Sequence, residues 1–210
     1  ADGPLFVKAN QESLAHGTTV EQCFEFMARA SAHFPFRVLM MGYYNTAFKM
    51  GHEVFVRRLA QAGAVGFILP DLPVEEAGEL HALAAAADLA PIVLMTPTST
   101  DARLQTLGAA AHGFVYVVAR KGVTGGSTAM NDDVTRLLDR CRAATDLPLA
   151  LGFGVASRED IAFIAEHADI AIIGNLDDDG YFVASIDEIA AMGSWPVTDV
   201  ERVLSAIQHC

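Results

Sequence analysis

Residues 113–126 read GFVYVVARKGVTGG, and this stretch places a binding site within an α/β scaffold. Its apolar part, FVYVVA, is typical of a parallel strand that is buried on both faces. The strand passes directly into a loop with glycines at positions 122, 125 and 126. In α/β proteins the loops at the carboxyl ends of strands line the binding crevice, and glycine lets backbone N–H groups approach an anion closely. We therefore expect the chemistry of this chain at this strand exit.

Strand-length apolar runs and helix-length stretches alternate along the rest of the chain. The apolar runs cover residues 38–44, 65–69, 92–96, 114–119, 147–151 and 170–173. Apolar residues at three- and four-residue spacing indicate helices over residues 22–32, 53–62, 75–87, 102–110, 132–144, 158–167 and 198–208. This alternation predicts parallel strands that are joined by right-handed helical crossovers.

Two architectures fit six such units: an open doubly wound sheet, or a (β/α)8 TIM barrel with only about six of its eight βα units present. We favour the barrel, as a single domain over residues 1–210, because glycine-bearing turns follow the last three strands, where barrels bind phosphate. The doubly wound alternative predicts G-x-G-x-x-G after the first strand, and this motif is absent from the sequence. Six strands close poorly into a barrel, and the chain starts on turn residues without an initiator Met. We therefore expect that sequence upstream of Ala1 is missing.

Composition and charge argue against several classes of function. The chain has 14 Lys and Arg against 26 Asp and Glu, and its net charge of -12 works against binding nucleic acid. Its three cysteines, Cys23, Cys141 and Cys210, are far apart and lack metal-site spacing, which fits a reducing cytoplasm. No apolar run reaches the ~20 residues of a membrane span. We expect a cytoplasmic protein that binds neither nucleic acid nor membrane.

Polar side chains near the ends of predicted strands are the candidates for chemistry. Tyr43, Asn45, Asp71 and Tyr116 lie in or just beyond these strands, and parallel strands bring their carboxyl ends to one edge of a sheet. Asp2, in the tight turn ADGP, adds a carboxylate. Each residue also has a structural interpretation, because Asp often caps turns and a buried Tyr is often part of the core.

Metal chemistry finds little support in the sequence, and we predict no metal site. The 7 histidines show neither H-x-x-x-H spacing nor spacing that pairs them with carboxylates. Asp177, Asp178 and Asp179 could chelate a divalent cation, but no EF-hand pattern surrounds them. A solvated loop is the simpler interpretation of these aspartates.

Several motifs together resemble the tryptophan synthase alpha subunit. They are ADGP at 1–4, YYN at 43–45, PDLPVEE at 70–76, Tyr116 followed by GVTG at 122–125, and GFGV at 152–155. Their order and spacing match the family over nearly the whole chain. The resemblance implies a (β/α)8 barrel that cleaves indole-3-glycerol phosphate to indole and glyceraldehyde 3-phosphate in a retro-aldol reaction, with no cofactor in this chain.

The resemblance also implies roles for individual residues. Asp2 would accept a hydrogen bond from the indole N–H, and Thr124 would orient Asp2, which makes these two the catalytic residues of this sequence. The implied substrate-binding residues are Tyr43, Tyr116, Gly125, Phe153, Gly154, Gly174 and Asn175. The family's partner is a beta subunit that carries pyridoxal phosphate, in a heterotetramer. The implied contacts with that partner are Asn45, Asp71 and Pro73.

The sequence departs from the family at two places. The family carries a catalytic glutamate about ten residues before its ADGP motif, so the chain as given lacks the expected Glu. The last phosphate turn, usually a Gly-Ser pair, reads Gly174-Asn175 followed within four residues by three aspartates, whose charges oppose phosphate. Two alternatives therefore stay open: a catalytically impaired homologue that regulates a beta subunit, and another phosphate-sugar barrel enzyme.

Overall fold

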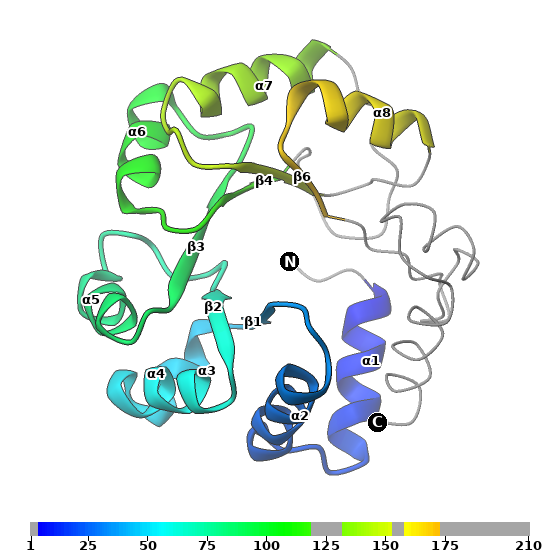
Figure 1. Ribbon diagram of the computed structural model, residues 1–210, viewed down its shortest axis with the longest axis vertical. Helices are drawn as coiled ribbons and strands as arrows, with labels where there is room; N and C mark the ends of the chain where they lie inside the picture. Colours follow the sequence, from blue (N-terminus) through cyan, green and yellow to red (C-terminus); the bar gives the residue numbers. More distant parts are fainter. Residues whose placement is uncertain (1–3, 119–131, 153–157, 173–210) are drawn as a thin grey trace.

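The computed structural model describes residues 4–118, 132–152 and 158–172, which form a curved parallel sheet with helices on its outer side (Figure 1). The strands are β1 (Val38–Met41), β2 (Ala64–Ile68), β3 (Ala90–Met95), β4 (Val115–Val118), β5 (Leu149–Gly152) and β6 (Ile170–Ala171). The helices are α1 (Pro4–Ala15), α2 (Val20–His33), α3 (Tyr44–Met50), α4 (His52–Gln61), α5 (Gly78–Ala86), α6 (Asp101–Ala110), α7 (Asp132–Arg142) and α8 (Arg158–His167).

The order of the strands decides the architecture. The sheet runs β1-β2-β3-β4-β5-β6, and each strand is parallel to the next one along the chain. A doubly wound sheet reverses its strand order at a switch point, whereas a barrel adds each strand beside the last. The described strands therefore form part of a (β/α)8 barrel, as predicted, and the open-sheet alternative is wrong. Figure 1 shows them as an arc with α2 to α8 outside it.

Successive side chains of each strand point to opposite faces of the sheet, and this divides the core into an inner and an outer layer. Ile68 and Ile92 contribute to a small inner cluster, and Tyr116 joins them there. Their chain neighbours Phe67 and Val93 face the helices, because successive side chains of a strand point to opposite faces. The outer layer consists of two separate clusters, one between β2 and helices α2, α4 and α5, the other between β3–β5 and helices α6, α7 and α8.

Local signals explain where several helices begin. Thr19 and Gln22 form a reciprocal capping box at the start of α2, in which each side chain accepts a hydrogen bond from the backbone N–H of the other. Thr100 caps α6 by accepting from the Arg103 N–H at 3.2 Å. Gly51 ends α3 and starts α4 with a φ of 83°, a left-handed conformation that favours glycine.

Two helices were not expected from the sequence. The first, α1, begins at Pro4, where the fixed φ of proline suits the first helical position, although the ADGP motif itself predicted only a turn. The second, α3, begins at Tyr44, so the expected strand over residues 38–44 ends earlier, at Met41. Tyr43 and Asn45 therefore lie in a turn and a helix that follow β1.

No helix in the described part of the chain has the length and apolar character that crossing a membrane requires.

Candidate active site

The carboxyl ends of β1–β6 share one edge of the sheet, which we call the mouth, and Tyr116 fills the inner face beneath it. Its side chain packs with Ile68 and Ile92, and only 9% of the residue is exposed. Burial raises the pKa of the Tyr116 phenol above its usual range. The hydroxyl therefore stays protonated at neutral pH and can donate a hydrogen bond to a ligand.

Gly152 makes room for Tyr116 on the neighbouring strand. A Cβ at position 152 would lie 2.5 Å from Cε2 of Tyr116 and 2.7 Å from its hydroxyl oxygen, distances that no real contact allows. The ring thus lies directly over the backbone of β5. The sequence suggested a phosphate turn here, but Gly152 lies in the strand itself and serves the packing of the tyrosine.

The turn between β1 and α3 carries Tyr43 at the N-cap position of α3. No side chain of the turn caps this helix, and Tyr43 is 48% exposed. The acceptor comes instead from the loop after β2, where Oδ1 of Asp71 accepts a hydrogen bond from the Tyr44 N–H at 2.8 Å. Asp71 therefore joins the ends of two neighbouring strands at the mouth.

The side chain of Tyr44 lies at one end of a short hydrogen-bond chain. Its hydroxyl is 2.9 Å from Nε2 of His52, and Nδ1 of His52 is 2.7 Å from Oε2 of Glu79. His52 is the first residue of α4, and Glu79 lies in the first turn of α5. The sequence gives no signal for this set, because His52 and Glu79 are 27 residues apart and no spacing pattern marks such a pair.

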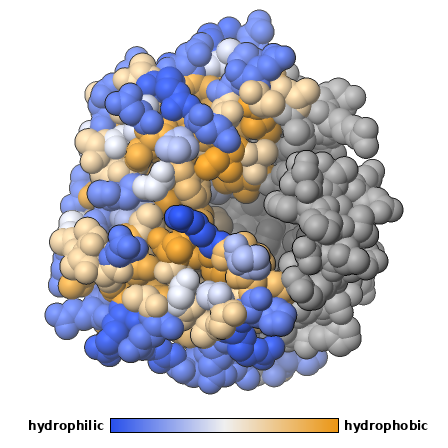
Figure 2. All heavy atoms as spheres, in the orientation of Figure 1, coloured by the Kyte–Doolittle hydropathy of each residue, from blue (hydrophilic) through white to orange (hydrophobic). Residues whose placement is uncertain are grey.

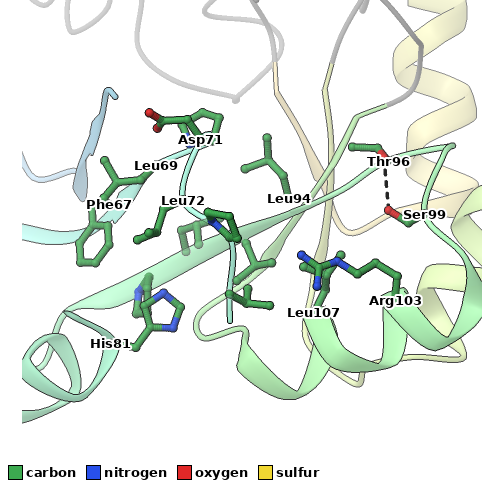
Figure 3. Close-up of a pocket in the computed structure, with 16 residues that line it drawn as sticks. Phe67, Leu69, Asp71, Leu72, His81, Leu94, Thr96, Ser99, Arg103 and Leu107 are labelled. Carbon is green, nitrogen blue, oxygen red and sulfur yellow. Dashed lines mark hydrogen bonds between the residues drawn. The ribbon is translucent and has the colours of Figure 1, made fainter. Parts of the chain in front are cut away.

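A cavity of about 310 Å³ lies outside the sheet, between α5 and α6 (Figure 3). The outward side chains of β2 and β3 form its floor, residues 70–74 cover it, and Asp71, His81 and Arg103 are its charged or titratable neighbours. The Arg103 guanidinium forms an ion pair with the Glu75 carboxylate and lowers the pKa of that carboxyl. Burial, and to a lesser extent His112, lowers the pKa of His81. The cavity extends from the helical layer to Asp71 and Thr96, which follow the carboxyl ends of β2 and β3. We assign the chemistry to the inner side of the mouth, where polar groups from several strands converge.

The hydropathy of the surface agrees with this choice. Figure 2 shows hydrophobic residues gathered around a hollow on the inner side of the arc. An apolar hollow with a few polar groups at its rim is the usual form of a small-molecule site.

The predicted site residues divide into two groups. Tyr116 lies on the inner face, whereas Tyr43 belongs to the exposed turn after β1 and is not part of the inner cluster. Asn45, Asp71 and Pro73 are exposed at or next to the mouth, in α3 and in the loop after β2. The remaining predicted site residues lie outside the described residues: Asp2, Thr124, Gly125, Phe153, Gly154, Gly174 and Asn175.

Within residues 4–118, 132–152 and 158–172, no three His, Cys, Asp or Glu side chains gather closely enough to hold a metal ion.

Sequence comparisons find relatives of this chain. The family model described as tryptophan synthase alpha chain matches residues 1–192. The tryptophan synthase alpha chain of Syntrophotalea carbinolica is 47% identical over 175 residues, which cover 83% of this chain and 69% of the relative. The alpha chain of Desulfotalea psychrophila is also 47% identical, with the same coverage.

Solved structures share the fold. The tryptophan synthase of Mycobacterium tuberculosis matches with a TM-score of 0.75 and 35% identity, over 82% of this chain and 66% of that chain. A protein from Aquifex aeolicus matches with a TM-score of 0.74 and 29% identity, over 100% of this chain and 76% of that one. The chain thus spans from 66% to 76% of the length of these solved relatives. By its motifs, its strand order and these relatives, the chain belongs to the tryptophan synthase alpha chain family.

Proposed function

We propose that the protein cleaves indole-3-glycerol phosphate to indole and glyceraldehyde 3-phosphate, as a lyase of tryptophan biosynthesis. The observation that carries the proposal is the family match over residues 1–192. The mouth of the barrel supports it, because Tyr116 offers a buried, protonated phenol on an apolar inner face. Such a face suits the flat indole ring, and a phenol can hydrogen-bond to the glycerol part of the substrate.

The reaction breaks the bond between C3 of the indole ring and the glycerol side chain. C3 gains a proton, and the glycerol hydroxyl next to the broken bond loses its proton and becomes the aldehyde. We assign to Asp2 the hydrogen bond from the indole N–H, which stabilises the positive ring, and to Thr124 the orientation of Asp2. The proposed substrate contacts are Tyr43, Tyr116, Gly125, Phe153, Gly154, Gly174 and Asn175.

The general acid/base of the proposed reaction is a glutamate. The family resemblance puts it about ten residues ahead of the ADGP motif. The reaction needs no cofactor in this chain.

The proposed partner is a beta subunit with pyridoxal phosphate, which would receive the indole. Asn45, Asp71 and Pro73 are exposed near the mouth, and two large apolar side chains are exposed beside them: Met41 is 58% exposed and Phe48 67%. Exposed apolar groups that are surrounded by polar ones are typical of a protein interface.

We further propose that the protein acts in the cytoplasm and that residues 1–210 belong to one domain.

An indole-release assay on the intact protein tests the proposal. Asp2→Asn should lower turnover by about 10²–10³-fold, because it removes the charge that stabilises the protonated ring. The matched control is Asp146→Asn, an exposed aspartate in the bend between α7 and β5. Circular dichroism checks that both variants are folded. Undiminished turnover in a folded Asp2→Asn variant would contradict the assignment.

The two alternatives are not favoured, because the family model and the relatives named above point to the alpha chain family. They make different predictions. A regulatory homologue would bind and activate a beta subunit while releasing no indole. Another phosphate-sugar barrel enzyme would turn over a different sugar phosphate in preference to indole-3-glycerol phosphate.

A further inference from the structure

We propose that Asp71 and His52 are positioning residues that lock the turn between β1 and α3 from two sides, and thereby set the place of Tyr43 at the mouth. The inference rests on the proposed function, because it gives a catalytic meaning to the place of Tyr43. It assigns to Asp71 a role within this chain, in addition to the partner contact suggested by the family.

The first lock is on the backbone. A helix leaves its first N–H groups without partners inside the helix, and α3 has no cap from its own turn. Asp71 supplies the acceptor from 27 residues away, through its 2.8 Å hydrogen bond with the Tyr44 N–H. A carboxylate at this place also interacts favourably with the positive end of the helix dipole. The loop after β2 is therefore fastened to the first residue of α3.

The second lock is on the side chain of the same residue. A carboxylate can only accept hydrogen bonds, so Nδ1–H of His52 donates to Oε2 of Glu79. In the tautomer with its single proton on Nδ1, His52 presents Nε2 as an acceptor for the Tyr44 hydroxyl, at 2.9 Å. The side chain of His52 is only 16% exposed, so its bond to Tyr44 is partly shielded from water and strengthened, whereas Glu79 is 74% exposed.

Both locks end on Tyr44, the residue directly after Tyr43. The rings of Tyr44 and His52 are in contact, with centroids 5.8 Å apart, so the phenol has little room to move. The conformation of the turn is thus determined by the loop after β2 and by the first turns of α4 and α5. Tyr43 itself is half exposed, and its own contacts bury it far less than Tyr116 is buried.

The test combines two single substitutions with a conservative rescue. Asp71→Ala removes the acceptor, and Tyr44→Phe removes the hydroxyl while keeping the ring. Each should lower kcat/KM for indole-3-glycerol phosphate about tenfold, because a misplaced contact residue costs about one to two orders of magnitude. Asp71→Asn keeps an oxygen acceptor and should restore the rate to within about threefold of the wild type, on the same reasoning. Asp146→Ala is the control for a lost carboxylate.

Two comparisons make the outcome decisive. The loss in Asp71→Ala should be equal with and without the beta subunit; a loss that occurs only with the beta subunit would reduce Asp71 to a partner contact and overturn the inference. Hydrogen exchange at the Tyr44 amide should accelerate in Asp71→Ala and return in Asp71→Asn. Unchanged hydrogen exchange at the Tyr44 amide in Asp71→Ala would overturn the inference, whatever the activity. A wild-type protein that releases no indole would contradict the proposed function, and the exchange result alone would then show whether Asp71 holds the turn.

Discussion

Tyr116 crosses the inner face of the sheet at a point where the neighbouring strand has no side chain. The ring needs the space above the backbone of Gly152, and the two residues act as one packing unit across β4 and β5. The sequence showed both residues but not their relation. The sequence predicts Tyr116 as a tyrosine near the end of a strand and Gly152 as part of a turn. The pairing became visible only with the register, which places Tyr116 opposite Ala150 and Val118 opposite Gly152.

Gly152→Ala tests this unit. The added methyl group would collide with the Tyr116 ring, and we expect the free energy of unfolding to fall by about 1–3 kcal/mol, as in other overpacked cores. Urea unfolding followed by circular dichroism measures the change. Gly78→Ala is the matched control, because a Cβ there meets no atom within 4 Å, and it should leave stability unchanged or raise it slightly. In a Tyr116→Leu background Gly152→Ala should cost less; an equal cost in both backgrounds would contradict the pairing.

At the scale of elements, the buried strands and the amphipathic helices were predictable from sequence, and the helices defined by distant contacts were not. The strands β2, β4 and β5 are nearly continuous apolar runs, which is typical of strands covered on both faces. The helix α7 has acids in its first turn and arginines in its last. By contrast, α3 has only 7 residues, and its first residue is capped by Asp71 from another loop. No local pattern contains that contact.

Asp169 joins three elements in a similar way. Its Oδ2 accepts a hydrogen bond from the Leu149 N–H at 2.7 Å and is paired with Arg142, so it connects the start of β5 with the end of α7 just before β6 begins. The hydrogen bond from Leu149, and then the pairing with Arg142, lowers the pKa of the Asp169 carboxyl. A lowered pKa in the folded state means that the ionised group stabilises the fold above its usual pKa, and that this contribution is lost as the pH falls through the folded value.

Asp169→Asn should therefore destabilise the protein in a pH-dependent way. The carboxylate is about half exposed, so solvent screens it and we expect a loss on the order of 1 kcal/mol near pH 7. The difference from the wild type should shrink as the pH falls below about 4, where carboxyls become protonated in both states. Urea unfolding of both proteins across this range measures it, with Asp146→Asn as control. A difference that is constant with pH would show that the charge contributes nothing.

At the scale of the whole molecule, strand alternation predicted an α/β fold but left the choice between an open sheet and a barrel. Both architectures have the same local pattern, and only the order of the strands separates them. The glycine turns favoured the barrel, and the consecutive order from β1 to β6 confirmed it. That Tyr116 lies in a buried strand could be predicted from the apolar run around it, whereas the bonds that join His52 to Tyr44 and Glu79 could not, because chain folding alone brings them together.

The buried thiol of Cys141 gives a measure of the intact fold. Cys141 lies in α7 within the outer core, and burial raises the pKa of its thiol to about 11. The thiolate is the reactive form, so Cys141 should resist alkylation at pH 8 in the folded protein and react fully in urea. Cys23 is exposed and serves as the internal reference. Mass spectrometry of the peptides after iodoacetamide treatment measures both; equal labelling of Cys141 and Cys23 without denaturant would contradict the packing of α7.

The cavity between α5 and α6 lies at the boundary of the two outer clusters, with Leu69 from one and Leu107 from the other among its lining residues. The helical layer is therefore interrupted along this line, where the side chains lining the cavity lack packing partners on one side. The sheet itself is continuous here, because β3 pairs with both β2 and β4, and the inner cluster of Ile68, Ile92 and Tyr116 spans the same three strands. The two halves of the outer core thus depend on the sheet and its inner face for their connection.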